Sequence, residues 1–176
     1  MKEIGRDSAL KLIDVLSKHK TSFLLLYAGL LLPVILLFYF FKPMVISGSS
    51  MYPTFHNNDH IVVDKFNGYI STLKRGDVIV FFSPIDENRL LVKRIIGLPG
   101  DVIAIRNGSV LLNGKLLREP YTNHRSESYE TIPAFLIPDD SVFVLGDNRL
   151  VSADSREWGA VDKSRIYGKY ILKLRN

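Results

Sequence analysis

The sequence contains no cysteine. That absence excludes a cysteine nucleophile, a thiolate metal site and any disulfide bond. A domain of this size buries enough apolar surface to fold without disulfides, so the absence does not assign the protein to either side of a membrane. The chain also lacks internal repeats and low-complexity tracts, and its 176 residues suit one domain of ordinary size with a short appendage.

Positive charge is only slightly in excess. There are 23 Lys and Arg residues against 18 Asp and Glu residues, which gives a net charge of +5 at pH 7. Such an excess suits a protein beside anionic lipid or, in principle, one that binds nucleic acid. No run of clustered Lys and Arg with interleaved aromatic residues is present, so we expect no nucleic acid partner.

One long stretch, from Thr21 to Phe41, carries no charged residue. As a helix with about 1.5 Å per residue it is roughly 30 Å long, the thickness of the hydrocarbon core of a bilayer. A cleavable signal peptide is the alternative, but its apolar region is shorter and ends close to a small-x-small site, which is absent here. We predict a retained transmembrane helix over residues 21–41.

Positive charge gathers before this stretch and not after it. Only Lys42 follows closely, whereas five basic residues precede it: Lys2, Arg6, Lys11, Lys18 and Lys20. The positive-inside rule therefore predicts that residues 1–20 lie in the cytoplasm and residues 42–176 lie outside. The apolar spacing from Ala9 to Leu16 favours a short amphipathic helix on the inner membrane face, and a frayed tail is equally compatible with it.

Beyond the apolar stretch the pattern changes to short strands and turns. Asn107-Gly108 supplies the two positive-φ residues of a tight hairpin turn, and Asn113-Gly114 repeats the signal. Residues 119–138 are polar and carry three prolines, so we expect a long excursion from the sheet there. The predicted strands cover residues 61–63, 78–82, 90–98, 102–106, 109–112, 141–145 and 166–174. The predicted fold is a mostly antiparallel β domain on one N-terminal transmembrane helix.

Three serines stand within four positions just after the apolar stretch: Ser47, Ser49 and Ser50. Gly48 lies among them and Pro53 fixes the backbone behind them, an arrangement that can hold one hydroxyl on a rigid turn, as a nucleophile requires. Serine and glycine are also common in linkers, and local composition favours that interpretation. The choice depends on whether the chain offers a base.

Histidine is the usual base for a serine, and three histidines lie beyond the membrane stretch: His56, His60 and His124. His56 and His60 are four residues apart, but a strand-and-turn setting does not stack them as a helix would. They also lack an evident third metal ligand. We therefore expect no metal and no cofactor.

A neutral lysine is the alternative base. Strand alternation puts Lys93 on one face with Leu91 and Ile95. Burial there would lower the pKa of the lysine from about 10.4 to about 7–8. Both faces of this strand are equally apolar, however, so the pattern is also compatible with Lys93 or Arg94 marking the solvent side.

A dense polar patch follows the predicted strand at 141–145. Residues 146–159 combine two aspartates and two arginines with Asn and Ser, which is too rich for a simple turn. We predict a loop that is held by Asp–Arg pairs and presents a hydroxyl inward. The predicted structural network consists of Asp147, Arg149, Asp154 and Arg156.

Taken together, these stretches resemble type I signal peptidases, membrane-bound serine proteases with a Ser–Lys dyad, in their short Gram-positive-like form. The segments that carry the resemblance are Ser47–Thr54, Asn58–Val63, Arg75–Ile79, Leu91–Asp101, Gly146–Arg149, Ser152 and Asp154–Arg156. Any one segment is moderately specific, whereas their order behind an N-terminal apolar stretch is very specific. One departure is Asn58, which stands where the family usually has glycine.

The resemblance implies that Ser50 is the nucleophile, because it lies directly before Met51 and three residues before Pro53. It implies Lys93 as the general base, Ser152 as the group that orients the lysine amine, and the backbone N–H of Ser50 as the oxyanion donor. Some relatives add a hydroxyl at the position of Gly48, so that donor is missing here. The implied pockets for small substrate residues are lined by Ile46, Met51, Phe55 and Val92.

The implied activity is removal of signal peptides from exported preproteins at small-x-small sites. The implied location is the bacterial cytoplasmic membrane, crossed once, with the lipid bilayer and the secretion translocon as further partners. Two alternatives remain. A self-cleaving Ser–Lys repressor-type protease is disfavoured by the membrane stretch, and an anchored non-catalytic domain that binds exported proteins is disfavoured by the Ser50–Lys93 pair.

Overall fold

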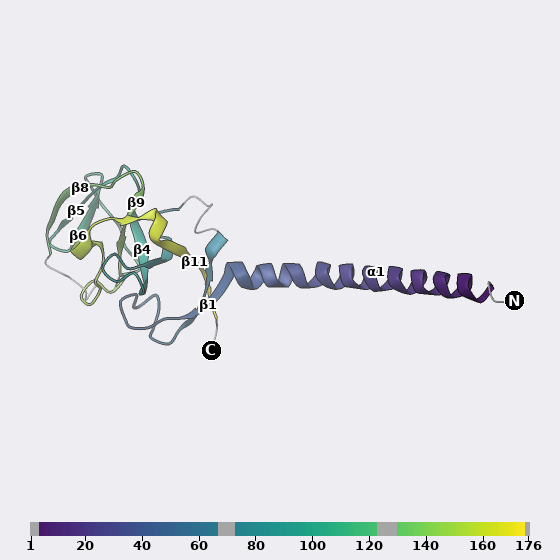
Figure 1. The fold of residues 1–176 in the computed structure, drawn as a ribbon. Coiled ribbons are helices and arrows are strands. Elements are labelled where there is room, and N and C mark those ends of the chain that lie inside the picture. Colours follow the sequence, from purple (N-terminus) through teal and green to yellow (C-terminus); the bar gives the residue numbers. More distant parts are fainter. Residues whose placement is uncertain (1–3, 67–72, 123–129, 175–176) are drawn as a thin grey trace. The chain divides into compact units, whose positions relative to one another are not determined.

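The computed structural model describes residues 4–66, 73–122 and 130–174. The chain divides into two compact units, Met1–Phe40 and Phe41–Asn176. The first unit contains one helix, and the second contains every described strand (Figure 1).

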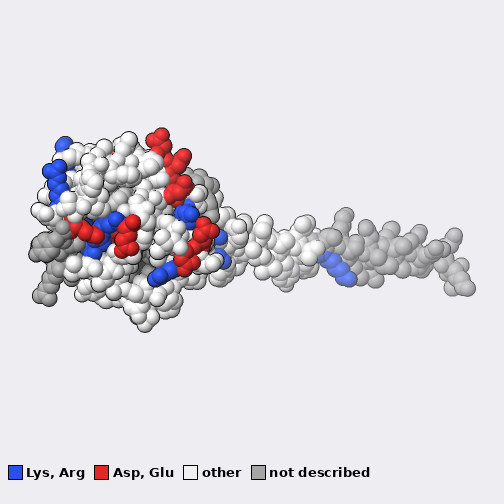
Figure 2. All heavy atoms as spheres, turned by 60° about the vertical axis from the view of Figure 1, so that its left-hand side comes forward, with Lys and Arg blue, Asp and Glu red and all other residues white. Residues whose placement is uncertain are grey.

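The N-terminal unit is the single helix α1, Ile4–Phe40. Its segment Ser22–Phe40, 19 residues with a mean hydropathy of 2.5, is long and apolar enough to cross a membrane. Figure 2 shows this part of the helix without Lys, Arg, Asp or Glu side chains. The helix is continuous from Ile4, so residues 9–16 are helical and not a frayed tail, and they form part of α1 instead of a helix of their own. Phe41, which was predicted to end the span, instead begins a strand.

A large sheet forms the body of the second unit. Its seven strands are antiparallel neighbours in the order β1-β2-β11-β3-β4-β9-β10. Their bounds are β1 Phe41–Val45, β2 His60–Asp64, β3 Val78–Phe82, β4 Leu90–Gly97, β9 Ser141–Leu145, β10 Val161–Asp162 and β11 Ile166–Lys173. This architecture confirms the predicted mostly antiparallel fold.

A small sheet packs beside it, in the order β7-β6-β5-β8. Its strands are β5 Val102–Arg106, β6 Ser109–Leu112, β7 Lys115–Leu116 and β8 Ile132–Leu136. Asn107 and Gly108 have φ angles of 48° and 77°, and Arg106 pairs with Ser109, so the predicted two-residue hairpin is confirmed. The prediction that residues 119–138 leave the sheet is wrong for β8. Its Pro133 is tolerated because β8 is an edge strand.

Apolar side chains cover both faces of the large sheet. On β3, Val78 and Val80 belong to one buried cluster, whereas Ile79 and Phe81 belong to a second. A third cluster joins Phe143 and Leu145 of β9 to the small sheet, which Figure 1 shows beside β9. Burial of both faces explains why the strands read as continuous apolar runs and why alternation alone did not orient Lys93.

Candidate active site

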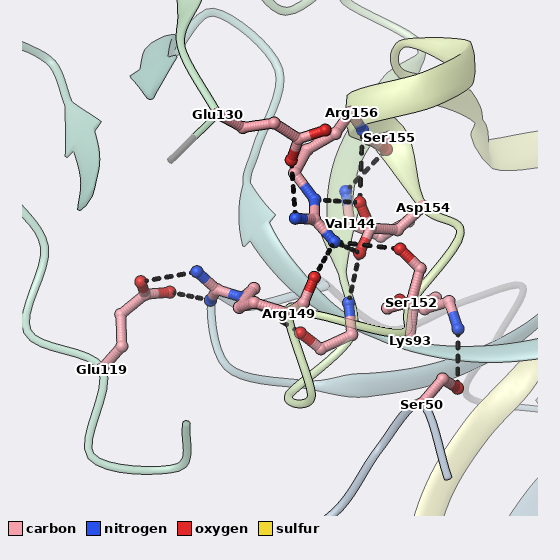
Figure 3. Close-up of polar contacts among 11 residues, drawn as sticks. Ser50, Lys93, Glu119, Glu130, Val144, Arg149, Ser152, Asp154, Ser155 and Arg156 are labelled. Carbon is pink, nitrogen blue, oxygen red and sulfur yellow. Dashed lines mark hydrogen bonds and ion pairs between the residues drawn. The ribbon is translucent and has the colours of Figure 1, made fainter. Parts of the chain in front are cut away.

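Ser50 and Lys93 lie together although 43 residues separate them in the sequence. The Nζ of Lys93 donates a hydrogen bond of 2.8 Å to the Oγ of Ser50, as Figure 3 shows. Lys93 comes from β4, where Leu91 and Ile95 pack in the second core cluster. Its residue is only 3% exposed, so it does not mark the solvent side of the strand.

The environment of Lys93 favours its neutral form. Burial lowers the pKa of the amine to about 8, because the charged form loses its hydration. The charges of Asp154 and Asp147 act in the opposite direction, while those of Arg89 and Arg156 lower the pKa further. Near pH 7 a larger share of the protein therefore carries a neutral lysine beside the Ser50 hydroxyl than would be the case for an exposed lysine.

The segment that carries Ser50 is a compact turn between β1 and β2. The N–H of Gly48 donates to Asn57 Oδ1 at 2.8 Å, and the N–H of Tyr52 donates to the Ser49 carbonyl at 3.1 Å. Asn58 has a φ of 69°, in the left-handed region that glycine adopts freely and asparagine tolerates. This backbone conformation explains why asparagine is accepted at a position where the resemblance leads us to expect glycine.

The four residues expected to line substrate pockets come together in the first core cluster. Ile46, Met51 and Phe55 are buried there, and Val92 is half-buried against them. Met51 and Phe55 are each 1% exposed, so their side chains form core that supports the Ser50 turn. Ile46 is 5% exposed and belongs to the same core, so of the four residues only Val92 is partly exposed.

The loop between β9 and the short helix α3, Ser155–Trp158, is hereafter the β9–α3 loop, residues 146–154. Only one expected Asp–Arg pair forms within this polar patch: Arg156 Nε donates to Asp154 Oδ1 at 2.8 Å. The other two members pair outside it. Asp147 accepts from Arg94 of β4, and Arg149 donates to Glu119 (Figure 3 shows the latter).

Ser152 is buried, and its Oγ has no hydrogen-bond partner among the described residues. The expected hydrogen bond to Lys93 is therefore not formed, and the Lys93 amine donates to Ser50 instead. The Ser152 hydroxyl packs against Gly146, where an added Cβ would lie 2.1 Å from Ser152 Oγ and 2.6 Å from the Ser50 carbonyl oxygen. Gly146 thus permits a close approach between the nucleophile turn and the β9–α3 loop.

The described histidines, His56 and His60, are not placed to act as the base for Ser50. His56 lies 3.9 Å from Asp59 through its Nδ1, and His60 begins β2 with an exposed side chain. Neither donates to or accepts from Ser50, and His124 lies outside the described residues. Over the described ranges, no group of three or more His, Cys, Asp or Glu side chains is arranged to hold a metal ion.

Three residues of the site were not identified from the sequence: Arg94, Glu119 and Tyr121. The Arg94 guanidinium lies 4.2 Å from the centre of the Tyr121 ring, and the Tyr121 hydroxyl donates to Glu119 at 3.0 Å. Burial and the neighbouring Glu119 carboxylate raise the pKa of that hydroxyl. The sequence could have indicated Arg94, because it is a second cation within an apolar strand. A buried arginine requires a partner.

Comparison with known proteins gives a consistent result. A family model described as "Signal peptidase, peptidase S26" matches residues 19–174. The chain belongs to this family. It is 35% identical over 149 residues to signal peptidase I T of Bacillus subtilis (strain 168), a match that covers 80% of this chain and 77% of that protein. It is 39% identical over 149 residues to a signal peptidase I of Bacillus amyloliquefaciens, covering 80% and 79%.

A solved structure agrees with these sequence matches. The crystal structure of a signal peptidase I from Enterococcus faecalis V583 superposes with a TM-score of 0.50 at 30% sequence identity, and the match covers 57% of this chain and 97% of that one. The predicted family, fold class and activity are therefore confirmed: the chain is a serine endopeptidase of the signal peptidase I type that cleaves signal peptides. Its apolar N-terminal helix is consistent with the single-pass membrane anchor of such enzymes.

Proposed function

We propose that Ser50 is the nucleophile and Lys93 the general base of this peptidase. The observation that carries the proposal is the 2.8 Å hydrogen bond between Lys93 Nζ and Ser50 Oγ, made by an amine whose pKa burial lowers to about 8. An amine whose pKa lies near neutral pH can both accept a proton from a hydroxyl and return it, as a general base and acid must.

In the first step the neutral Lys93 amine takes the hydroxyl proton of Ser50 while Oγ bonds to the scissile carbonyl carbon of the preprotein. The resulting ammonium gives its proton to the leaving amine as the peptide bond breaks, which leaves an acyl-enzyme on Ser50. Lys93, neutral again, takes a proton from water as that water attacks the ester. The proton then passes to Ser50 Oγ, and the free signal peptide leaves.

The transition state of each step carries a negative oxygen that needs a donor. Among the described residues the Ser50 N–H makes no hydrogen bond, so it is available for this role. Gly48 has no hydroxyl, and its own N–H is engaged by Asn57. We assign the buried Ser152 hydroxyl to the orientation of Lys93 once the amine has turned from Ser50 to the leaving group, since it lacks another partner.

Substrate choice follows from the apolar surroundings of the nucleophile. Val92, the residue before Lys93, is partly exposed and packs on the first core cluster, in which Ile46, Met51 and Phe55 are buried. A shallow apolar surface of this kind favours small side chains, as in Ala-x-Ala-like cleavage sites. Preprotein signal peptides with small-x-small ends are the proposed substrates.

The chain crosses the bacterial cytoplasmic membrane once in this proposal. Residues 1–20 lie in the cytoplasm, residues 21–41 include the span, and residues 42–176 form the peptidase domain outside, as the clustered N-terminal positive charge supports. Ser50 follows Phe41 by nine residues, at most about 30 Å from the membrane boundary. A signal peptide held in the same bilayer, beside the secretion translocon, then meets the site at raised effective concentration.

The test uses detergent-solubilised full-length protein and a signal-bearing precursor. Wild type should release the signal peptide, Ser50→Ala and Lys93→Ala should release none, and His60→Ala should retain activity. Cleavage that survives in either dyad variant would overturn the assignment. Loss in His60→Ala with retention in Lys93→Ala would point to a histidine base instead.

A further inference from the structure

Asn148 contacts the nucleophile turn at two successive carbonyls. Its backbone N–H donates to the Ser50 carbonyl at 3.0 Å, and its side-chain Nδ2 donates to the Ser49 carbonyl at 3.2 Å. Asn148 is half-buried and belongs to the β9–α3 loop, which approaches the turn closely where Gly146 lacks a side chain.

The Ser49 carbonyl and the Ser50 N–H belong to one peptide unit. Because a peptide unit is planar and its C=O and N–H point in opposite directions, a donor that fixes the carbonyl also fixes the direction of the N–H. We propose that the Asn148 side chain is a positioning residue that aims the Ser50 N–H at the oxyanion. This inference rests on the proposed role of Ser50 as nucleophile.

The proposed site depends strongly on this peptide unit, because Gly48 supplies no second donor to the oxyanion. Gly48 offers no hydroxyl, and Asn57 occupies its N–H. The remaining donor, the Ser50 N–H, is without an acceptor in the described part of the chain. A hydrogen bond to the carbonyl of the same unit also polarises the N–H and makes it a stronger donor.

The turn holds the Ser49 carbonyl from one further side. The N–H of Tyr52 donates to it at 3.1 Å, a bond that closes the turn locally. Asn148 adds a donor from a separate element, so rotation of the Ser49–Ser50 peptide would break a contact between the turn and the β9–α3 loop. The backbone bond from Asn148 to Ser50 ties the two elements independently of the side chain.

The substitution Asn148→Ala tests the proposal because it removes the side-chain donor and keeps the backbone bond. Asn57→Ala is the matched control: it deletes another asparagine side chain that holds this turn, but one that bonds Gly48 rather than the Ser49–Ser50 peptide. Full-length variants in detergent are compared for kcat, KM, the pH profile of kcat/KM, and thermal unfolding. Loss of a direct oxyanion donor lowers kcat by about 10²–10³.

For Asn148→Ala we expect kcat to fall by about 10- to 100-fold with KM changed less than about twofold, since an oxyanion donor acts only in the transition state. The midpoint of the pH profile, which reports Lys93, should stay in place. A peptide aldehyde, which forms a tetrahedral adduct on the serine, should bind more weakly by the same factor as kcat. The cleaved signal peptide should bind as in wild type.

Two results would overturn the inference. The first is a kcat of Asn148→Ala within about twofold of wild type. The second is an equal loss of kcat in Asn57→Ala together with an equally lowered unfolding temperature in both variants, which would make Asn148 a structural support only. Failure of the proposed function is recognised separately, because it requires cleavage by Ser50→Ala or Lys93→Ala and does not depend on Asn148.

Discussion

Arg94 and Asp147 face each other through two parallel hydrogen bonds, from Nε to Oδ1 at 2.8 Å and from Nη2 to Oδ2 at 2.7 Å. The side chains are 11% and 1% exposed, and Thr54 donates to the same carboxylate. Arg94 follows Lys93, Thr54 follows Ser50 by four residues, and Asp147 lies in the β9–α3 loop. The pair therefore joins the three segments that carry the proposed active site.

Breaking this pair from one side should be costly. Arg94→Met leaves the Asp147 carboxylate buried without its cation, and we expect the free energy of unfolding to fall by about 3–5 kcal/mol. The double variant Arg94→Met/Asp147→Leu removes both charges and should recover most of that loss. Urea unfolding of the three proteins in detergent measures the difference. Additive losses in the double variant would show that the pair is not coupled.

The close approach at Gly146 makes a second prediction. In Gly146→Ala the new Cβ meets the Ser152 hydroxyl and the backbone carbonyl of Ser50. The Ser50 carbonyl oxygen belongs to the backbone, so it cannot move away by a change of side-chain rotamer. We expect kcat/KM to fall by at least about tenfold, with a loss of about 1–3 kcal/mol in unfolding free energy. Gly29→Ala, where the added Cβ meets nothing within 4 Å, is the control and should retain activity. An active Gly146→Ala enzyme would contradict the tight contact.

The pKa of Lys93 predicts the pH dependence of cleavage. A base must be neutral, so kcat/KM should rise about tenfold per pH unit below about 8 and level off above it. The positive charge of Arg89 lowers this pKa, so Arg89→Ala should move the midpoint upward, whereas Arg89→Lys should leave it in place. A kcat/KM profile measured from pH 5 to 10 gives both midpoints. A midpoint that stays fixed in Arg89→Ala would show that its charge does not reach the site.

Much of the fold followed from short-range signals. The Asn-Gly turns specified the β5–β6–β7 meander because both residues of each turn tolerate positive φ. The apolar run specified α1, since few side-chain types satisfy a helix of that length and composition. Strand β8 was missed because its partner β5 is remote in sequence and its Pro133 argued against a strand.

The site was harder to predict than the fold. The sequence offered Lys93 and Arg94 as equal candidates for the solvent side, and both are largely buried because apolar clusters cover the two faces of the sheet. Glu119 and Tyr121 gave no signal, since their contacts to Arg149 and Arg94 join segments about 30 residues apart. Such pairs follow no local period, and only the folded arrangement reveals them.

The left-handed backbone at Asn58 makes a prediction about stability. Asn58→Gly should leave the free energy of unfolding within about 1 kcal/mol of wild type, because glycine adopts a φ of 69° without strain. Asn58→Val should lose about 1–2 kcal/mol or more, because its branched Cβ disfavours this region. Urea unfolding compares the two. Equal stabilities would contradict the left-handed conformation at this position.

Replacement of the buried lysine should stabilise the protein while it abolishes cleavage. A pKa lowered from 10.5 to about 8 corresponds to a penalty of about 3 kcal/mol on the charged form in the folded state, which Lys93→Met removes. Below pH 8 the amine is charged in both the folded and the unfolded chain, so wild type bears the whole penalty there. Between pH 8 and 10.5 only the unfolded chain keeps the proton, so wild-type stability rises with pH.

The advantage of Lys93→Met should therefore be largest at pH 7 and should shrink as the pH rises toward 10.5. Urea unfolding at pH 7 and pH 10 measures this difference, with Ser50→Ala as the control that keeps the lysine and should follow the wild-type pH dependence. An advantage that does not change with pH would assign the effect to side-chain packing. If the stability difference between Lys93→Met and wild type shrinks, the folded protein is less stable because it keeps beside Ser50 an amine with a lowered pKa. A purely structural lysine would not require that loss of stability.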